Sequence, residues 1–193
     1  PLFPVPYLFK GVAQLQKNKY EAAVESLNAG IKLVSMNNAL LVQFYTSLGD
    51  AYNRLKNYKL SDESYEKALK LDPENSYVLN NYAYYLSLRN ENLAKAEVMS
   101  AKSLKLDAAN AANMDTYGWV LYKLGRYPEA IQWVEKAVSA TASPDSDLLE
   151  HLGDIYFKLG DTEKAVLNWQ KALNAGTGSQ NLEKKIKERK LYE

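Results

Sequence analysis

The chain has 193 residues, of which 47% are hydrophobic and 24% are charged, a composition typical of a soluble domain. Its 24 Lys and Arg residues nearly balance its 23 Asp and Glu residues, so the net charge of +1 gives no general electrostatic reason to bind nucleic acid or an anionic membrane. The absence of cysteine excludes disulfides and thiolate metal sites, while a reducing and an oxidising compartment both stay open.

The chain opens with PLFPVPYLF instead of Met and contains no apolar run of about 18 residues. We therefore expect a fragment or a processed chain whose targeting signal lay upstream. We also expect no direct membrane insertion by this segment.

Small residues recur at three matching places in five successive segments, with one residue inserted at the corner of the third. In chain order they are Gly11, Ala23 and Gly30; Gly49, Ser61 and Ala68; Ala83, Ala96 and Ser103; Gly118, Ala130 and Ala137; and Gly153, Ala165 and Ala172. Small residues let two helices approach closely, and the Leu, Tyr and Trp residues between them at helical spacing fill the groove. Self-similarity at a fixed period of about 20 to 50 residues predicts a repeat architecture, here one of helix-turn-helix units.

The predicted corners between helices carry the residues that such turns need. Gly160 and Asp161 supply a left-handed stop followed by an N-cap, Pro128 suits a first helical turn, and Asp72-Pro73 ends a helix. We therefore predict units at about 4–41, 42–75, 76–110, 111–145 and 146–179.

The repeated pattern resembles the tetratricopeptide repeat (TPR) family. The second unit matches best, through Tyr45, Leu48, Gly49, Tyr52, Tyr58, Tyr65, Ala68 and Pro73. The first and third units depart more, since Gly30 stands where Ala is usual and Ala83 where Gly is usual. The resemblance implies an all-α fold, a right-handed α-solenoid of about five units over residues 1–179. It further implies a solvating C-terminal capping helix in 180–193, with Leu182 and Ile186 on one stripe.

The resemblance also implies a concave groove lined by the first helix of every unit. Carried over to this sequence, the partner-binding positions are Asp50, Asn53, Tyr77, Asn80, Tyr84, Asp115, Trp119, Tyr122, Asp147, Glu150, Asp154 and Phe157. The aromatic residues among them would form a strip, made of Tyr84, Trp119, Tyr122 and Phe157. Beside it would lie an acidic rim, made of Asp115, Asp147, Glu150 and Asp154. Such a surface favours a partner segment with cationic and apolar residues.

Trp119 is the residue on which this groove depends most. We assign it to the groove, and the alternative is that it packs against the next repeat as a core residue. Trp133 and Trp169 lie on second helices and are expected in the core.

Catalysis finds little support in the sequence. His151, the only histidine, could share a helix face with Asp154 as a metal ligand, but zinc requires more ligands than this pair. There is no Gly-rich loop between a strand and a helix, and no nucleophile elbow. We expect a protein that is not an enzyme, with no catalytic residue, cofactor or metal, and we expect His151 to serve in helix packing or at an interface.

The favoured function is a non-catalytic scaffold that binds an extended peptide or a partner protein in its groove, as part of a larger protein. The alternative is a structural subunit that assembles through its convex face or its repeat ends, including self-association, because PLFPVPYLF is strongly apolar. The oligomeric state stays open.

The last repeats are also similar to those of bacterial cell-envelope TPR proteins, several of them lipoproteins that hold partner proteins at the membrane. That likeness rests on MDTYGWVLYKLGRYPEA and LLEHLGDIYFKLGDTEKAVLNWQKAL. It implies a periplasmic or outer-membrane-associated location.

Overall fold

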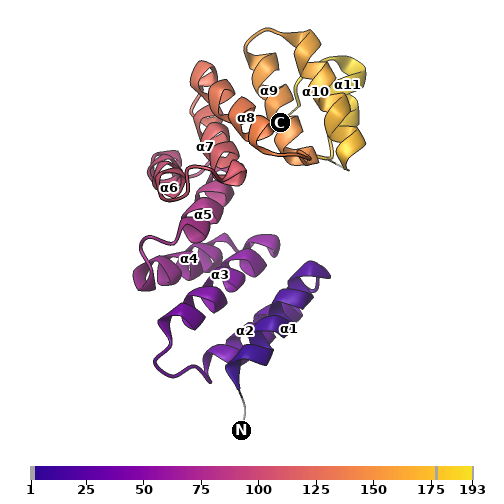
Figure 1. The fold of residues 1–193 in the computed structure, drawn as a ribbon. Coiled ribbons are helices and arrows are strands. Elements are labelled where there is room, and N and C mark those ends of the chain that lie inside the picture. The colour runs from indigo at the N-terminus through magenta and orange to yellow at the C-terminus, as the bar shows by residue number, and fades with distance from the viewer. Residues whose placement is uncertain (1–2, 177, 193) are drawn as a thin grey trace. The chain divides into compact units, whose positions relative to one another are not determined.

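A computed structural model describes residues 3–176 and 178–192, and this part of the chain forms eleven α-helices and no strand (Figure 1). In chain order they are α1 (Pro4–Gln16), α2 (Tyr20–Ile31), α3 (Asn38–Arg54), α4 (Tyr58–Leu71), α5 (Ser76–Leu88), α6 (Leu93–Leu106), α7 (Ala111–Lys123), α8 (Tyr127–Ala140), α9 (Ser146–Lys158), α10 (Thr162–Ala175) and α11 (Leu182–Glu188). The odd-numbered helices α1 to α9 are the first helices of the five expected units. The all-helical repeat fold expected from the sequence is confirmed.

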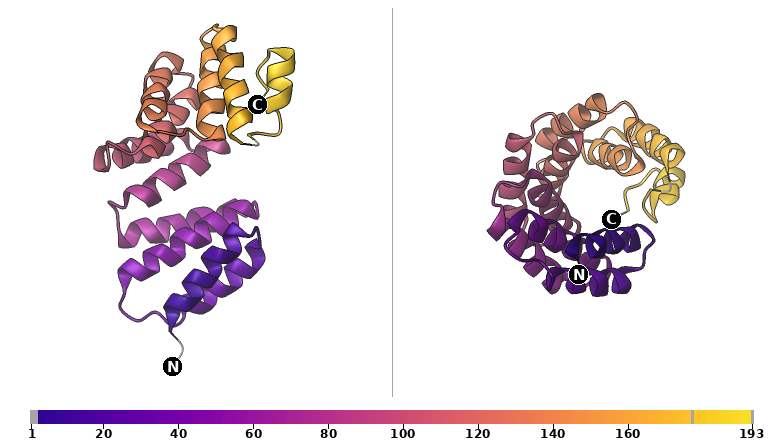
Figure 2. Two further views of the ribbon diagram at one scale, coloured as in Figure 1. Left: turned by 45° about the vertical axis from the view of Figure 1, so that its right-hand side comes forward. Right: turned by 60° about the horizontal axis from the view of Figure 1, so that its bottom comes forward.

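Helices that follow one another pack as hairpins: α1 with α2, α3 with α4, α7 with α8, and α9 with α10. At the C-terminal end α11 packs against α10, and the three last helices lie side by side (Figure 2). Because each hairpin buries only one face within itself, the remaining apolar surface is covered by the next hairpin, as α2 with α3 and α8 with α9 illustrate.

The recurring small residues mark the places where two helices touch. A Cβ added at Gly153 would lie 2.4 Å from Trp169 Cδ1, and one added at Gly49 would lie 2.7 Å from Tyr65 Cε2. Both distances are far inside van der Waals contact, so the second helix brings an aromatic ring directly onto the backbone of the first. Trp169 is fully buried, as the sequence analysis expected.

Local chemistry sets the ends of the helices. The side chains of Asn37, Asn57, Asp145 and Asp161 each accept a hydrogen bond from a backbone N–H in the first turn that follows. At its corner Gly160 has a φ of +87°, a left-handed conformation that favours glycine.

Helix α3, the first helix of the second expected unit, begins at Asn38, ahead of residue 42, where that unit was expected to start. The reason is local, because Asn37 caps the helix by accepting from Leu40 N at 2.9 Å.

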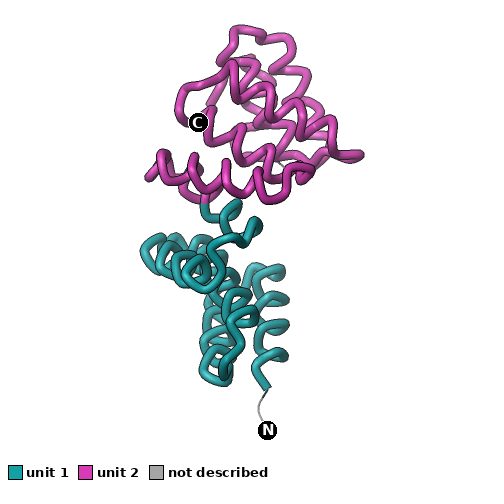
Figure 3. The backbone as a smooth tube through the Cα atoms, turned by 60° about the vertical axis from the view of Figure 1, so that its left-hand side comes forward, with its two compact units in different colours: residues 1–82 teal, residues 83–193 magenta. Residues whose placement is uncertain are grey.

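Contacts divide the chain into two compact units, residues 1–82 (unit 1) and residues 83–193 (unit 2), with the division inside α5 (Figure 3). From the repeat pattern, residues 1–179 were expected to form one run of repeats. Unit 1 has a core cluster around Leu8, Leu27, Phe44 and Leu48. In the part of unit 2 that the structure describes, one cluster lies between α7, α8 and α9 and another between α9, α10 and α11. Within the described ranges, no helix combines the length and apolar character needed to cross a membrane.

Candidate binding surfaces on the first helices

Unit 2 contains a cavity of about 250 Å³ beside the first helices α5, α7 and α9. The C-terminal segment after α10 supplies the rest of its lining, including Ser179, Lys185 and Tyr192. The predicted site residues that line it are Tyr84, Trp119, Asp147, Glu150 and Asp154. The structure thus brings five predicted residues to one hollow, together with Ser179 and with residues of the segment 180–193, which was expected as a capping helix.

Trp119 is packed in the core between two hairpins. Only 6% of its surface is exposed, and its ring stacks on Tyr122, with centroids 4.5 Å apart, and on His151, with centroids 3.9 Å apart. Tyr122 is 3% exposed. This placement corrects the expectation of an open aromatic strip. The ring of Trp119 was expected to face a partner, but His151 of the following hairpin covers it. Trp119 still lines the cavity, and its Nε1 has no hydrogen-bond partner among the described residues.

His151 is the partner of Asp115. Its Nδ1 lies 3.0 Å from Asp115 Oδ1 and 3.1 Å from Oδ2, joining α9 to α7. Burial alone would lower the pKa of His151, but the charge and hydrogen bond of Asp115, with Asp154 and Asp147 nearby, raise this pKa above its ordinary value. Asp115, expected as part of an open acidic rim, is therefore engaged within the chain.

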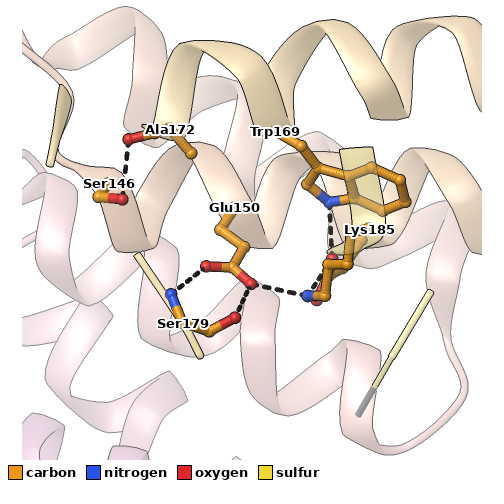
Figure 4. Close-up of polar contacts among 7 residues, drawn as sticks. Ser146, Glu150, Trp169, Ala172, Ser179 and Lys185 are labelled. Atoms are coloured by element: carbon orange, nitrogen blue, oxygen red, sulfur yellow. Dashed lines mark hydrogen bonds and ion pairs between the residues drawn. The ribbon is translucent and has the colours of Figure 1, made fainter. Parts of the chain in front are cut away.

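Lys185 of α11 pairs with two of the three acidic residues of α9, and Figure 4 shows its contact with Glu150. Its Nζ lies 2.7 Å from Glu150 Oε1 and 2.7 Å from Asp154 Oδ2, and all three side chains are almost fully buried. Trp169 Nε1 donates to Asp154 Oδ1 at 2.8 Å, and Ser179 donates to Glu150 from both its backbone N–H and its hydroxyl. The carboxylates thus have several partners besides the ammonium group, as buried charges require.

The pKa values of Glu150 and Asp154 are shifted in opposite directions. Burial would raise the pKa of Glu150, but hydrogen bonds from Lys185 and Ser179 hold it below its usual value. For Asp154 burial prevails and raises the pKa, in spite of Lys185 and Trp169.

This cluster corrects the expectation that Glu150 and Asp154 form an open rim for a cationic partner, because the chain's own lysine occupies them. Sequence reasoning missed Lys185. A signal was present, since Lys185 lies on the same helical stripe as Leu182 and Ile186, and a lysine on an apolar stripe suggests a buried counter-charge. Phe157, the last predicted residue of this helix, is half-buried and packs against Trp169 at 5.8 Å between centroids.

Unit 1 contains a second cavity, of about 260 Å³, lined by α1, α3 and the start of α5. The predicted residues Asp50 and Tyr77 line it, and Tyr65 donates a hydrogen bond to Asp50 Oδ1 at 2.5 Å. Tyr77 and Phe9 expose 62% and 68% of their surfaces. Phe9 was not predicted, because the carried-over positions began with the second unit. Asn53 is half-buried and outside the lining of this cavity, and Asn80 is buried.

Across 3–176 and 178–192, no group of three or more His, Cys, Asp or Glu side chains could hold a metal ion.

Sequence models described as tetratricopeptide repeat match residues 6–33, 42–75, 64–98, 104–147 and 118–179. The chain therefore belongs to the tetratricopeptide repeat family. The fold of this family suggests a scaffold for protein–protein interaction, and its members are generally non-catalytic.

Two curated relatives come from Pseudomonas aeruginosa. A TPR repeat-containing protein is 25% identical over 77% of this chain and 24% of its own length. The type IV pilus assembly protein PilF is 26% identical over 79% of this chain and 59% of its own length. The chain thus spans only part of each relative.

Solved structures show the same fold. The Pseudomonas aeruginosa PilF structure matches with a TM-score of 0.76 at 19% identity, over 93% of this chain and 79% of that one. A thermophilic TPR protein of Thermus thermophilus matches with a TM-score of 0.75 at 17% identity, over 96% and 98% of the two chains.

Replacing Lys185 tests the buried charge cluster. Lys185→Met leaves Glu150 and Asp154 buried without a cation, and we expect the free energy of unfolding to fall by about 3–5 kcal/mol in urea titrations. Lys187→Met, on the exposed side of α11, is the matched control and should change it by less than about 0.5 kcal/mol. Equal effects of the two substitutions would contradict the cluster.

The pairing of His151 with Asp115 predicts a pH dependence. Because the folded pKa is raised above the ordinary value of 6.5, the pair contributes stability that is complete below about this pH and is lost as pH rises through the folded pKa. As His151 is the only histidine, proton NMR of its ring reports the midpoint directly. We expect the midpoint of His151 to lie above 6.5 in the unmodified chain. In Asp115→Asn we expect it below 6.5, because burial lowers this pKa and the charge of Asp115 no longer opposes the effect. A midpoint that Asp115→Asn leaves unchanged would exclude this pairing.

Proposed function

We propose that this chain is a non-catalytic scaffold that binds an extended peptide or a segment of a partner protein along its first helices. The observation that carries the proposal is that a cavity lies along the first helices in each unit: α1, α3 and α5 line one in unit 1, and α5, α7 and α9 line one in unit 2. Exposed aromatic rings such as Phe9 and Tyr77 offer large contact area at low entropic cost, which is typical of binding hot spots.

The two cavities differ in chemistry. The cavity of unit 1 is lined mainly by apolar and aromatic side chains, including Leu8, Val12 and Val42. The cavity of unit 2 is lined by several charged side chains as well as by aromatic rings. A partner segment with both apolar and basic residues suits this pair of surfaces.

We further propose that the chain is part of a larger protein of the bacterial cell envelope, in a periplasmic or outer-membrane-associated location. The similarity to PilF, whose name describes assembly of the type IV pilus, supports this context. In this proposal the chain carries no cofactor and does not bind nucleic acid.

Selection from a random peptide library on the immobilised chain tests the scaffold function. We expect a family of related peptides to be enriched, and Tyr77→Glu to weaken their binding by at least about 2 kcal/mol, measured by fluorescence anisotropy. Val98→Glu places the same charge at a residue that is 70% exposed on the second helix α6 and should leave binding unchanged. The absence of any enriched peptide, or equal loss in both variants, would count against binding along the first helices.

A second candidate function is self-association through the N-terminal end. Phe3, Val5 and Phe9 expose 63%, 42% and 68% of their surfaces within a short segment, an apolar patch that favours contact with another chain.

Light scattering across a range of protein concentrations tests this alternative. If it holds, the apparent mass should rise with concentration and return to that of a monomer in the double variant Phe3→Ser, Val5→Ser. Point substitutions are preferable to deleting this end, because Leu8 is 4% exposed and belongs to the core of unit 1. A constant monomeric mass for the unmodified chain would rule the alternative out.

A further inference from the structure

Three polar groups at the cavity of unit 2 have no hydrogen-bond or ion-pair partner among the described residues: the carboxylate of Asp147, the hydroxyl of Tyr84 and Nε1 of Trp119. They come from α9, α5 and α7, and all three residues line the same hollow. Trp119 is 6% exposed, and its Nε1 is a buried N–H donor without an acceptor among the described residues.

Among the described residues, the ion pairs around the cavity leave Asp147 without a cation of its own. Asp115 is paired with His151, and Glu150 and Asp154 share the single ammonium group of Lys185. Lys123 is the remaining nearby cation, and its Nζ lies over the rings of Trp119 and Tyr122 at 4.9 and 5.7 Å.

The titration of nearby groups is consistent with a lack of positive charge. Burial raises the pKa of Asp147, and Asp145, Glu150 and Asp115 raise it further, against the opposing charge of His151. Burial likewise raises the pKa of the Tyr84 hydroxyl, with Asp147 and Asp115 adding to the effect.

We propose that this cavity is the subsite for one basic side chain, arginine or lysine, of the bound peptide. In this arrangement the cation pairs with Asp147 and lies against the ring of Tyr84, a combination of carboxylate and aromatic face that suits cations. The inference rests on the proposed peptide-binding function, and it names the chemistry of the partner at one position.

The chain itself contains a precedent for this recognition. Lys185 reaches the neighbouring carboxylates of α9 and places its Nζ within 2.7 Å of both, beside the indole of Trp169, whose centroid is 5.9 Å away. An acidic peptide side chain would instead meet Asp147 with like charge and is disfavoured.

The experiment uses the peptides enriched by selection on the complete chain, with affinities measured by fluorescence anisotropy. We expect one position of these peptides to be Arg or Lys. Asp147→Asn should weaken their binding about tenfold, and replacing that arginine by citrulline should weaken it equally. Citrulline should add no further loss in Asp147→Asn, as a double-mutant cycle on one pair requires.

Two further variants separate the local effect from a general charge or folding effect. Glu25→Gln removes an exposed carboxylate from α2 in unit 1 and should leave the affinity unchanged. Lys123→Gln removes the cation beside the cavity and should strengthen binding of the basic peptide. Melting curves of all variants show whether the fold is kept.

The outcomes distinguish this inference from the scaffold function. If peptides are enriched without a basic residue, or if Asp147→Asn retains their full affinity, the scaffold function stands and the basic subsite is overturned. If acidic peptides are enriched and Lys123→Gln weakens them, the cavity has the opposite preference. If the unmodified chain enriches no peptide, both proposals fail together.

Discussion

The close approach of two helices within each hairpin is the constraint on which the rest of this structure depends. Gly153 under Trp169 and Gly49 under Tyr65 let an aromatic ring of the second helix rest on the backbone of the first. This contact fixes which stripe of each helix is buried, and therefore which stripe of a first helix can face a cavity. A larger residue at either glycine would have to displace a buried ring, so the face available for binding follows from the core.

At the C-terminal end, buried charged side chains also fix how the helices pack. The tail after α10 returns to α9 and places Lys185 between Glu150 and Asp154, with Trp169 and Ser179 completing their hydrogen bonds. Burying three charges is favourable only when each is paired and hydrogen-bonded, which they are here. The tail is thereby both a cap for the last repeat and a wall of the cavity in unit 2, and it withdraws two carboxylates from the surface that a partner can reach.

A second contact within the chain covers two further residues that were predicted to line the groove. His151 contacts Asp115 through its ring nitrogen and Trp119 through its ring face, so one side chain of α9 engages two predicted groove residues of α7. What stays open in unit 2 is a smaller surface around Tyr84 and Asp147, while unit 1 keeps Phe9 and Tyr77 exposed. The cavity of unit 1 thus has a mainly apolar lining, whereas several charged side chains line the cavity of unit 2.

The sequence by itself determined the repeat fold and the small residues at helix contacts, because these depend on period and on local capping chemistry. It also indicated that α11 has an apolar stripe at Leu182 and Ile186. It could not show that Lys185 would occupy Glu150 and Asp154, or that His151 would cover Trp119, because each of these contacts joins side chains from helices far apart along the chain. Position within a repeat fixes the face on which a side chain lies, whereas only the packing of the following hairpin and the tail decides whether that face is open or occupied.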